Sequence, residues 1–188
     1  MADIFIIAGP NGAGKTTASY TILPEILGIR QFVNADEIAK GLSPFNPGSV
    51  AIQSGRIMLS RIKELLKKEE DFAFETTLST KSYVNLIKDA QKSNRRVKII
   101  FFFLDSPELA IERVKTRVSE GGHFIPEDVV KRRYYKGIQN FKNRYMGLVD
   151  EWIVFDNSGN TLIFVGECSK DKRIIIHDKE VWRKIQQL

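Results

Sequence analysis

The residues with the clearest chemical meaning form one run near the start of the chain, Gly9-Pro10-Asn11-Gly12-Ala13-Gly14-Lys15-Thr16. This run matches the phosphate-binding pattern G-x-x-x-x-G-K-[ST] at every fixed position. Its glycines let successive backbone N–H groups point at phosphate oxygens, and the N-terminus of a following helix adds its dipole. We expect Lys15 to reach the β- and γ-phosphates of ATP or GTP, and the Thr16 hydroxyl to bind Mg²⁺.

Two carboxylates follow the second and third candidate strands of the chain, Asp36 and Glu75. Ligands of an open α/β sheet bind at the carboxyl ends of its strands, so both carboxylates should face the same crevice as the phosphate loop. Asp36 can accept the proton of an attacking hydroxyl or hold Mg²⁺ through water. Glu75, with Thr76 and Thr77 as neighbouring donors, can orient the Mg²⁺ shell or bind a substrate hydroxyl. For both carboxylates, helix capping is the alternative.

A basic region carries four candidate arginines, Arg113, Arg117, Arg132 and Arg133. Guanidinium groups stabilise the charge that phosphoryl transfer spreads over three oxygens. The two pairs flank Gly121-Gly122, which predicts a lid-like helical segment over about 106–145 that closes on bound nucleotide. A solvated basic helix is the alternative. His123 is a candidate substrate contact or a cap of the lid.

The segment 131–145 interleaves basic and aromatic side chains and contains no acidic residue. Such a pattern can form a stacking platform for single-stranded nucleic acid. We favour a helix with its aromatic rings packed inward and its cations outside.

Short apolar runs alternate with helical patterns along the whole chain. The candidate strands are 4–8, 31–34, 71–75, 97–104, 152–156, 161–165 and 173–177. This alternation predicts a P-loop NTPase fold of the α/β class, a parallel sheet with helices on both faces. We expect one domain over 1–188, with a small C-terminal β extension and a closing helix at 179–188.

The composition is that of a globular protein of 188 residues with a formal net charge of +6. The charge is compatible with nucleic acid or with phosphorylated small molecules as partners. The longest apolar run, 99–104, is far short of the roughly 20 residues that cross a bilayer. With a single cysteine, Cys168, and no signal-like start, the sequence predicts a cytoplasmic protein without a membrane partner.

Several segments in this order resemble those of the zeta-toxin-like P-loop kinases. They are the phosphate loop through Thr17, Asn34-Ala35-Asp36, Phe74-Glu75-Thr76-Thr77-Leu78, Arg113-Val114 to Arg117-Val118, Gly121-Gly122-His123, Arg132-Arg133-Tyr134 and Asp156-Asn157-Ser158. The resemblance implies an adenylate-kinase-like fold. It also implies transfer of phosphate from ATP or GTP to a sugar hydroxyl, which in the toxin members belongs to UDP-N-acetylglucosamine, and an antitoxin protein as a candidate partner.

The resemblance also implies roles for individual residues. Asp36 corresponds to the general base, Lys15 to the phosphate-loop lysine and Glu75 to a substrate-side glutamate. Arg117 and one of Arg132 or Arg133 correspond to a clamp on the γ-phosphate. Arg113 corresponds to a residue that stacks on the nucleotide base, and Thr17 and Asn157 belong to the nucleotide site.

Two other functions stay open at this point. One is nucleic-acid binding, as in a polynucleotide 5′-hydroxyl kinase. The other is a non-catalytic nucleotide-binding regulator.

Overall fold

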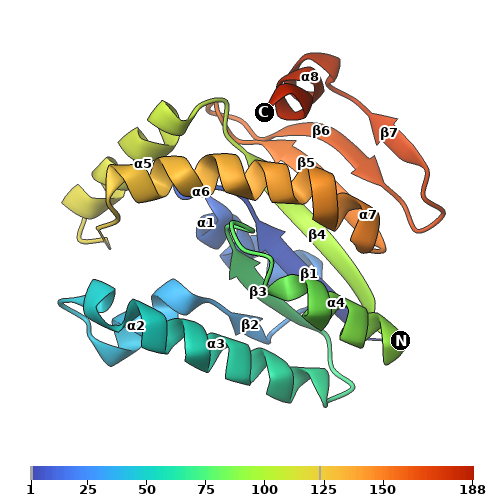
Figure 1. Ribbon diagram of the computed structural model, residues 1–188, viewed down its shortest axis with the longest axis horizontal. Coiled ribbons are helices and arrows are strands. Elements are labelled where there is room, and N and C mark those ends of the chain that lie inside the picture. The colour runs from blue at the N-terminus through green and yellow to red at the C-terminus, as the bar shows by residue number, and fades with distance from the viewer. Residues whose placement is uncertain (1, 123) are drawn as a thin grey trace.

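The computed structural model describes residues 2–122 and 124–188, and its centre is a seven-stranded sheet of order β2-β3-β1-β4-β5-β6-β7 (Figure 1). The strands are β1 (Asp3–Ala8), β2 (Phe32–Val33), β3 (Phe72–Thr76), β4 (Arg96–Phe103), β5 (Glu151–Asp156), β6 (Ile163–Cys168) and β7 (Ile174–Ile176). The first five strands pair in parallel, and β6 and β7 extend the sheet antiparallel. The predicted α/β class, with its C-terminal β extension, is confirmed.

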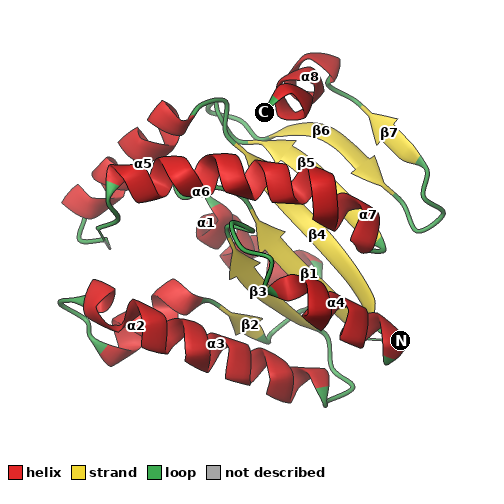
Figure 2. Cartoon of the chain, in the orientation of Figure 1, coloured by secondary structure: helices red, strands yellow, loops and turns green. Residues whose placement is uncertain are grey.

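Helices cover both faces of the sheet, with α6 and α7 in front of it and α1 behind it in the view of Figure 2. The helices are α1 (Lys15–Thr21), α2 (Ala35–Leu42), α3 (Ala51–Leu66), α4 (Tyr83–Lys92), α5 (Pro107–Ser119), α6 (Glu127–Asn140), α7 (Met146–Leu148) and α8 (Lys179–Gln187). Short turns of other types are η1 (Ile22–Ile26), η2 (Pro47–Val50) and η3 (Phe141–Tyr145). The basic helix predicted to run through 145 therefore changes at Phe141 from α to π geometry.

The central strands are buried on both faces, which explains why their sequences read as continuous apolar runs. All six residues of β1 are buried. On β4, Phe101 stacks on Phe141 with ring centroids 4.2 Å apart, while the next residue, Phe102, lies on the opposite face beside Gly9. Successive side chains of a strand point to opposite faces, so Phe101 faces η3 while the Phe102 ring lies on the other face and stacks on Phe155 with centroids 5.9 Å apart.

β1 lies at the point where the order in which successive strands are added to the sheet changes direction. From β1 the chain runs outward to β2, returns to β3, and then crosses to β4 on the other side of β1. Ligands of open α/β sheets bind at such a switch point, beyond the carboxyl ends of the strands. The loops after β1, β2 and β3 therefore meet at one edge of the sheet.

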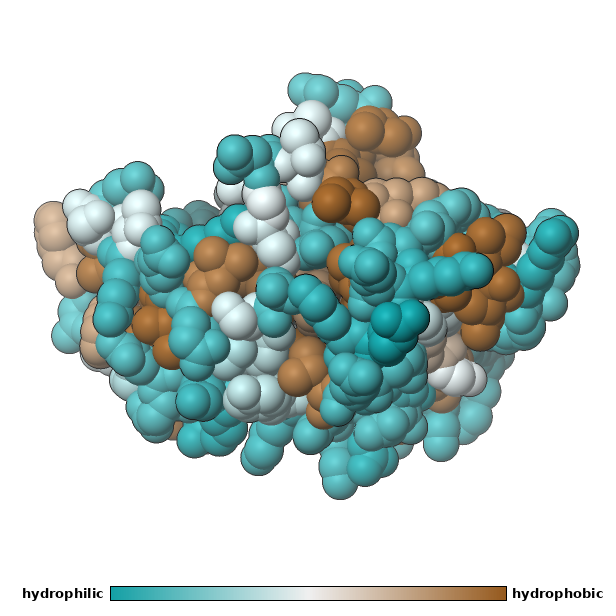
Figure 3. Space-filling model, turned by 90° about the horizontal axis from the view of Figure 1, so that it is seen from above, coloured by the Kyte–Doolittle hydropathy of each residue, from teal (hydrophilic) through white to brown (hydrophobic). Residues whose placement is uncertain are grey.

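The C-terminal elements close one end of the sheet. Trp182 of α8 stacks on Trp152 of β5 with ring centroids 5.5 Å apart and planes inclined by 8°. Seen from the side of α8, β6 and β7, the surface carries separate apolar patches among polar side chains (Figure 3). None of the helices in 2–122 and 124–188 is long and apolar enough to cross a membrane.

Candidate active site

The phosphate loop connects β1 to α1 in a backbone conformation that needs glycine. Gly9 has φ 142°, and a Cβ atom there would lie 2.2 Å from the carbonyl oxygen of Phe102. Gly14 has φ 76°, and its Cβ would lie 2.6 Å from Nδ2 of Asn157. Left-handed φ values and this close approach both disfavour any residue with a Cβ atom. The glycines thus let the loop curl before α1 begins at Lys15.

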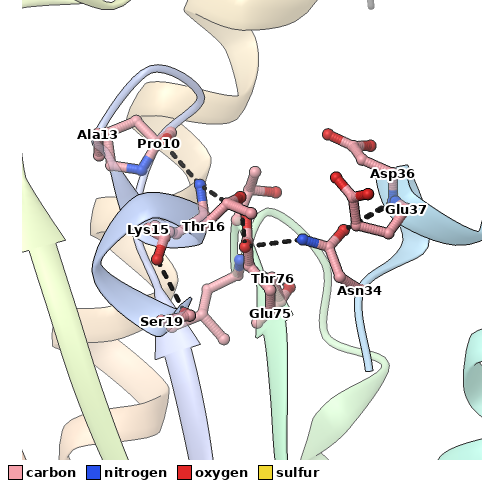
Figure 4. A network of polar contacts seen from close by, with 12 residues as sticks. Pro10, Ala13, Lys15, Thr16, Ser19, Asn34, Asp36, Glu37, Glu75 and Thr76 are labelled. Carbon is pink, nitrogen blue, oxygen red and sulfur yellow. Dashed lines mark hydrogen bonds and ion pairs between the residues drawn. The ribbon is translucent and has the colours of Figure 1, made fainter. Parts of the chain in front are cut away.

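A compact polar network joins the start of α1 to the end of β3 (Figure 4). Lys15, which is 5% exposed, donates from Nζ to the Pro10 carbonyl at 2.9 Å. The same Nζ lies 3.6 Å from Oε1 of Glu75, and the Thr16 hydroxyl donates to Oε2 of Glu75 at 2.8 Å. A buried ammonium group needs such a counter-charge. Glu75 is therefore a partner of the phosphate loop. The capping alternative for it is wrong, because the next helix, α4, has Ser82 at its N-cap position.

Asp36 lies at the second residue of α2, and the cap of that helix is Asn34. The side chain of Asn34 accepts hydrogen bonds from the backbone N–H groups of Asp36 at 2.8 Å and Glu37 at 3.4 Å. The carboxylate of Asp36 is therefore not needed as a cap, and the capping alternative is wrong here too.

Two pockets open on either side of this network. One of about 740 Å³, here called the loop pocket, is lined by the phosphate loop together with Tyr20, residues of α2, residues of α5 and Gly121-Gly122. The other, of about 420 Å³, here called the α3 pocket, is lined by α3 and the segment after β3. Four residues line both pockets: Asn11, Lys15, Asp36 and Glu75. Ligands in the two pockets would therefore meet at these side chains.

Arg113 and Arg117 of α5 both line the loop pocket, as do Thr16 and Thr17. The guanidinium group of Arg113 donates to the carbonyl oxygens of Asn157 at 2.6 Å and Ser158 at 3.1 Å, which fixes its place beside Gly12.

Asn157 supports the phosphate loop from outside the loop pocket. Its amide donates to the Ala13 carbonyl at 3.0 Å, and its side chain is not part of the pocket lining. The family resemblance implies that Asn157 belongs to the nucleotide site. The structure places its amide against the Ala13 carbonyl of the phosphate loop, outside the pocket lining.

The two neighbouring arginines of α6 differ sharply in position. Arg133 lines the α3 pocket, whereas Arg132 is exposed and lines neither pocket. Burial lowers the pKa of the Arg133 guanidinium, and the nearby Asp36 carboxylate opposes that shift. Within 2–122 and 124–188, no hydrogen bond or ion pair engages Arg133. The structure thus brings Arg133 to the site and leaves Arg132 outside it, while His123 lies outside the described residues.

The segment after β3 is held in an unusual conformation by α6 and η3. Leu78 is fully buried with φ 53°, a strained value for a bulky side chain. Its carbonyl accepts from the Asn140 amide at 2.8 Å, and the Thr80 carbonyl accepts from the Tyr145 hydroxyl at 2.8 Å. Burial raises the pKa of Tyr145 to about 12, so the hydroxyl remains a donor.

Thr76 and Thr77 also line the α3 pocket, and their hydroxyls are partly engaged. Thr76 accepts from the backbone N–H of Leu78 at 3.1 Å, and Thr77 is 2.9 Å from the Ser79 hydroxyl. These contacts shape the wall of the pocket and leave several hydroxyl groups at its surface.

The sequence predicted no role in the site for Asn34, Asn140 and Tyr145, although Asn34 lies in one of the segments that carry the family resemblance. Asn34 carried one available signal, because an Asn two residues before a helical Asp is a preferred N-cap. Asn140 and Tyr145 gave no local signal, since their partners are about 60 residues away.

The donor set at the phosphate loop fits Mg²⁺. The Thr16 hydroxyl and the Glu75 carboxylate are hard oxygen donors in direct contact. Across the described part of the chain no group of three or more His, Cys, Asp or Glu side chains is placed to hold a metal. Mg²⁺ usually takes one or two protein oxygens and completes its shell with phosphates and water, so this sparse set is sufficient.

The aromatic residues of 131–145 pack inward and do not form a platform for bases, and Tyr135 is half-buried against the core. Tyr134, Phe141 and Tyr145 are fully buried, and the Tyr134 hydroxyl donates to the Leu104 carbonyl at 2.7 Å. The inward-packed interpretation of this segment is confirmed.

Solved structures share this fold. A chain of the AvrRxo1-ORF1:AvrRxo1-ORF2 complex has a TM-score of 0.81 at 16% identity, covering 98% of this chain and 63% of that one. A chain of the PezAT toxin-antitoxin system of Streptococcus pneumoniae has a TM-score of 0.62 at 12% identity, covering 100% and 84%. A gluconokinase from Sinorhizobium meliloti 1021 has a TM-score of 0.53 at 16% identity, covering 84% and 83%. This chain therefore spans less than two thirds of the AvrRxo1 protein.

Two sequence comparisons add to the fold. An uncharacterized protein of Haemophilus influenzae is 32% identical over 126 residues, which is 67% of this chain and 88% of that protein. The model of the zeta toxin family matches residues 2–168, which include the phosphate loop, both carboxylates and all four arginines. The chain belongs to the zeta toxin family.

Proposed function

We propose that this protein is a Mg²⁺-dependent phosphotransferase that moves the γ-phosphate of ATP or GTP to a hydroxyl group of a small molecule. Nucleotide-dependent kinase activity is supported by the zeta toxin family and by P-loop kinases among the fold neighbours. The observation that carries the proposal is the junction of the two pockets at Asn11, Lys15, Asp36 and Glu75. A donor and an acceptor must meet in line for phosphoryl transfer, and two pockets that share lining residues support such a meeting.

The nucleotide occupies the loop pocket in this proposal. Backbone N–H groups of the phosphate loop and Lys15 hold its β- and γ-phosphates, and Arg117 adds positive charge from α5. Arg113 lies against the nucleotide base and Thr17 against the phosphates. An AvrRxo1 complex has been solved with ATP, which supports ATP for a related fold.

Asp36 acts as the general base on the acceptor hydroxyl. It lines both pockets, so one side chain can touch an acceptor in the α3 pocket while it faces the γ-phosphate. Removing the hydroxyl proton as the bond to phosphorus forms makes the oxygen a better nucleophile. Arg133 offers a half-buried cation on the acceptor side, where it can hold the transferring group or an anionic acceptor.

Mg²⁺, when bound with the nucleotide, neutralises charge on the β- and γ-phosphates. Thr16 and Glu75 are the residues that would hold it. Their contact at 2.8 Å leaves lone pairs of the Thr16 oxygen free to face a cation while its hydrogen is donated to Glu75.

The lining of the α3 pocket favours a polar acceptor rich in hydroxyl groups. Its walls carry the hydroxyl residues Thr76, Thr77, Ser79, Thr80, Ser82 and Tyr83 with the cations of Arg56 and Arg133, next to the apolar side chains of Ile52, Met58 and Leu59. A nucleotide sugar such as UDP-N-acetylglucosamine, implied by the family resemblance, matches this chemistry and is our first candidate.

Three further proposals complete this function. Residues 1–188 form a single domain, in which about 106–145 acts as a lid over the nucleotide. An antitoxin protein is a partner, because one fold neighbour belongs to a toxin-antitoxin system. The site of action is the cytoplasm.

The test is transfer of label from γ-labelled ATP with Mg²⁺ to a small-molecule extract of cells. We expect label in a compound that keeps its phosphate under the acid conditions that hydrolyse the γ-phosphate of ATP. The Lys15→Ala variant is the control and should yield none. Label appearing instead on the 5′-end of added oligonucleotides would identify a polynucleotide kinase. ATP binding without any labelled product would indicate a regulator, and either result contradicts the proposal.

A further inference from the structure

Asn34 lies between the start of α2 and the Glu75 carboxylate, and both polar atoms of its side chain form hydrogen bonds. It follows β2, begins α2, and is 6% exposed. Its Oδ1 accepts from two backbone N–H groups at the start of α2, and its Nδ2 donates to Oε2 of Glu75 at 2.9 Å (Figure 4). Because N–H donors lie on one side and a carboxylate on the other, only one orientation of the amide satisfies both.

The contact with Glu75 extends into the phosphate loop. Oε2 of Glu75 accepts from both Asn34 and Thr16, while Oε1 faces Lys15. Asn34 thus connects the helix that carries Asp36 to the carboxylate that partners the phosphate loop. Backbone pairing holds the start of α2 near β3 only weakly, because β2 pairs with β3 over two residues.

We propose that Asn34 is a positioning residue, whose amide fixes the Glu75 carboxylate toward Thr16 and holds Asp36 at its place over the loop. The inference rests on the proposed phosphotransferase function. An Asn side chain suits this position because it has an acceptor for the helix cap and a donor for the carboxylate. Aspartate would keep the cap, but it would set a second carboxylate against Glu75.

The Asn34→Asp variant separates the two contacts. The carboxylate of Asn34→Asp can still accept from the N–H groups at the start of α2, so the cap is kept. It has no N–H to donate to Glu75, and it brings a second acceptor against the Glu75 carboxylate. Glu75 should therefore turn away from Thr16 while α2 keeps its place.

The experiment compares kcat and the KM for ATP in the transfer reaction of Asn34→Asp, the wild type and Asp178→Asn, with thermal unfolding as a check of folding. Asp178 caps α8 in the same way, accepting from the N–H groups of Glu180 and Val181 at 3.0 Å, and it lines neither pocket. We expect Asn34→Asp to lower kcat about 10-fold or more and to leave the KM for ATP within about 3-fold of the wild-type value, because the cap of α2 is kept and the Glu75 contact is lost. Asp178→Asn should match the wild type in both constants.

A second measurement reports on the contact without any transfer. The side-chain amide ¹H–¹⁵N signals of Asn34, assigned by NMR, should shift in Glu75→Gln and stay in place in Asp178→Asn. Unshifted Asn34 signals in Glu75→Gln would overturn the inference, and so would a wild-type kcat for Asn34→Asp, because capping alone would then explain Asn34. A wild type that transfers no phosphate would instead contradict the proposed function, and the Asn34 amide signals would still decide the contact.

Discussion

At the scale of single residues, adjacent arginines of α6 offer a matched pair. Arg133 lines the α3 pocket beside Asp36, and Arg132 is exposed on another side of the helix. We predict that Arg133→Ala lowers the transfer rate by about 10²-fold, the usual effect of removing one group that stabilises developing charge. Arg132→Ala should leave the rate within about 2-fold of the wild type, since an exposed arginine outside both pockets contributes little.

Steady-state transfer assays on both variants, with thermal unfolding as a check of folding, measure this difference. Equal losses in the two variants would show that the positive charge of the helix as a whole matters and that the position of Arg133 does not.

The sequence predicted the phosphate loop and both carboxylates because their signals are local. A fixed motif, or a charge directly after an apolar run, needs no knowledge of distant residues. The choice between Arg132 and Arg133 depended on helix phase. Val130, Tyr134 and Ile138 form the buried stripe of α6, and Arg133 lies at its edge one residue from Tyr134. That periodicity was present in the sequence and is the signal that could have separated the two arginines.

At the scale of elements, α6 and the segment after β3 touch at Gly137. A Cβ atom on Gly137 would lie 2.4 Å from the Thr77 carbonyl oxygen, so the helix can approach only because this residue is glycine. We predict that Gly137→Ala lowers the free energy of unfolding by about 1–3 kcal/mol, because the helix or the segment must move. The same shift should raise the KM for the acceptor.

Gly41 of α2 provides the matched control, because a Cβ atom there would meet nothing within 4 Å. Gly41→Ala should stabilise the protein by up to about 1 kcal/mol through helix propensity. Denaturant unfolding of the two variants measures the contrast. A stabilised Gly137→Ala variant would contradict this contact, because it would mean that the space between α6 and the Thr77 carbonyl accommodates a methyl group.

The elements themselves were well predicted, and the differences have physical causes. Each of the seven candidate strands is present, with different bounds. β2 is confined to Phe32–Val33, the apolar pair within 31–34, and β6 covers Ile163–Cys168 where 161–165 was predicted. The lid remains a prediction. Its helix α6 is anchored in the core by Val130, Tyr134 and Ile138, so any closing motion must involve other parts of 106–145.

At the scale of the whole molecule, the alternation of strands and helices was enough to predict the fold class. Parallel strands require crossovers, and helices on both faces follow from that requirement. The relation between the two pockets could not be predicted. α3 and the segment after β3 line the α3 pocket, whereas α5 and Gly121-Gly122 line the loop pocket. The relation depends on the two pockets meeting at the phosphate loop, which brings together elements that are far apart in the sequence.

The central claim is that Asp36 activates an acceptor at the junction of the two pockets. The most direct measurement is single-turnover transfer from γ-labelled ATP to the acceptor identified in the extract experiment, by the wild type and by Asp36→Asn. Asparagine is almost isosteric but cannot take a proton, so Asp36→Asn should bind Mg²⁺ and ATP with unchanged affinity and transfer at least about 10²-fold more slowly. Transfer by Asp36→Asn at the wild-type rate would contradict the account, because the acceptor would then be activated elsewhere.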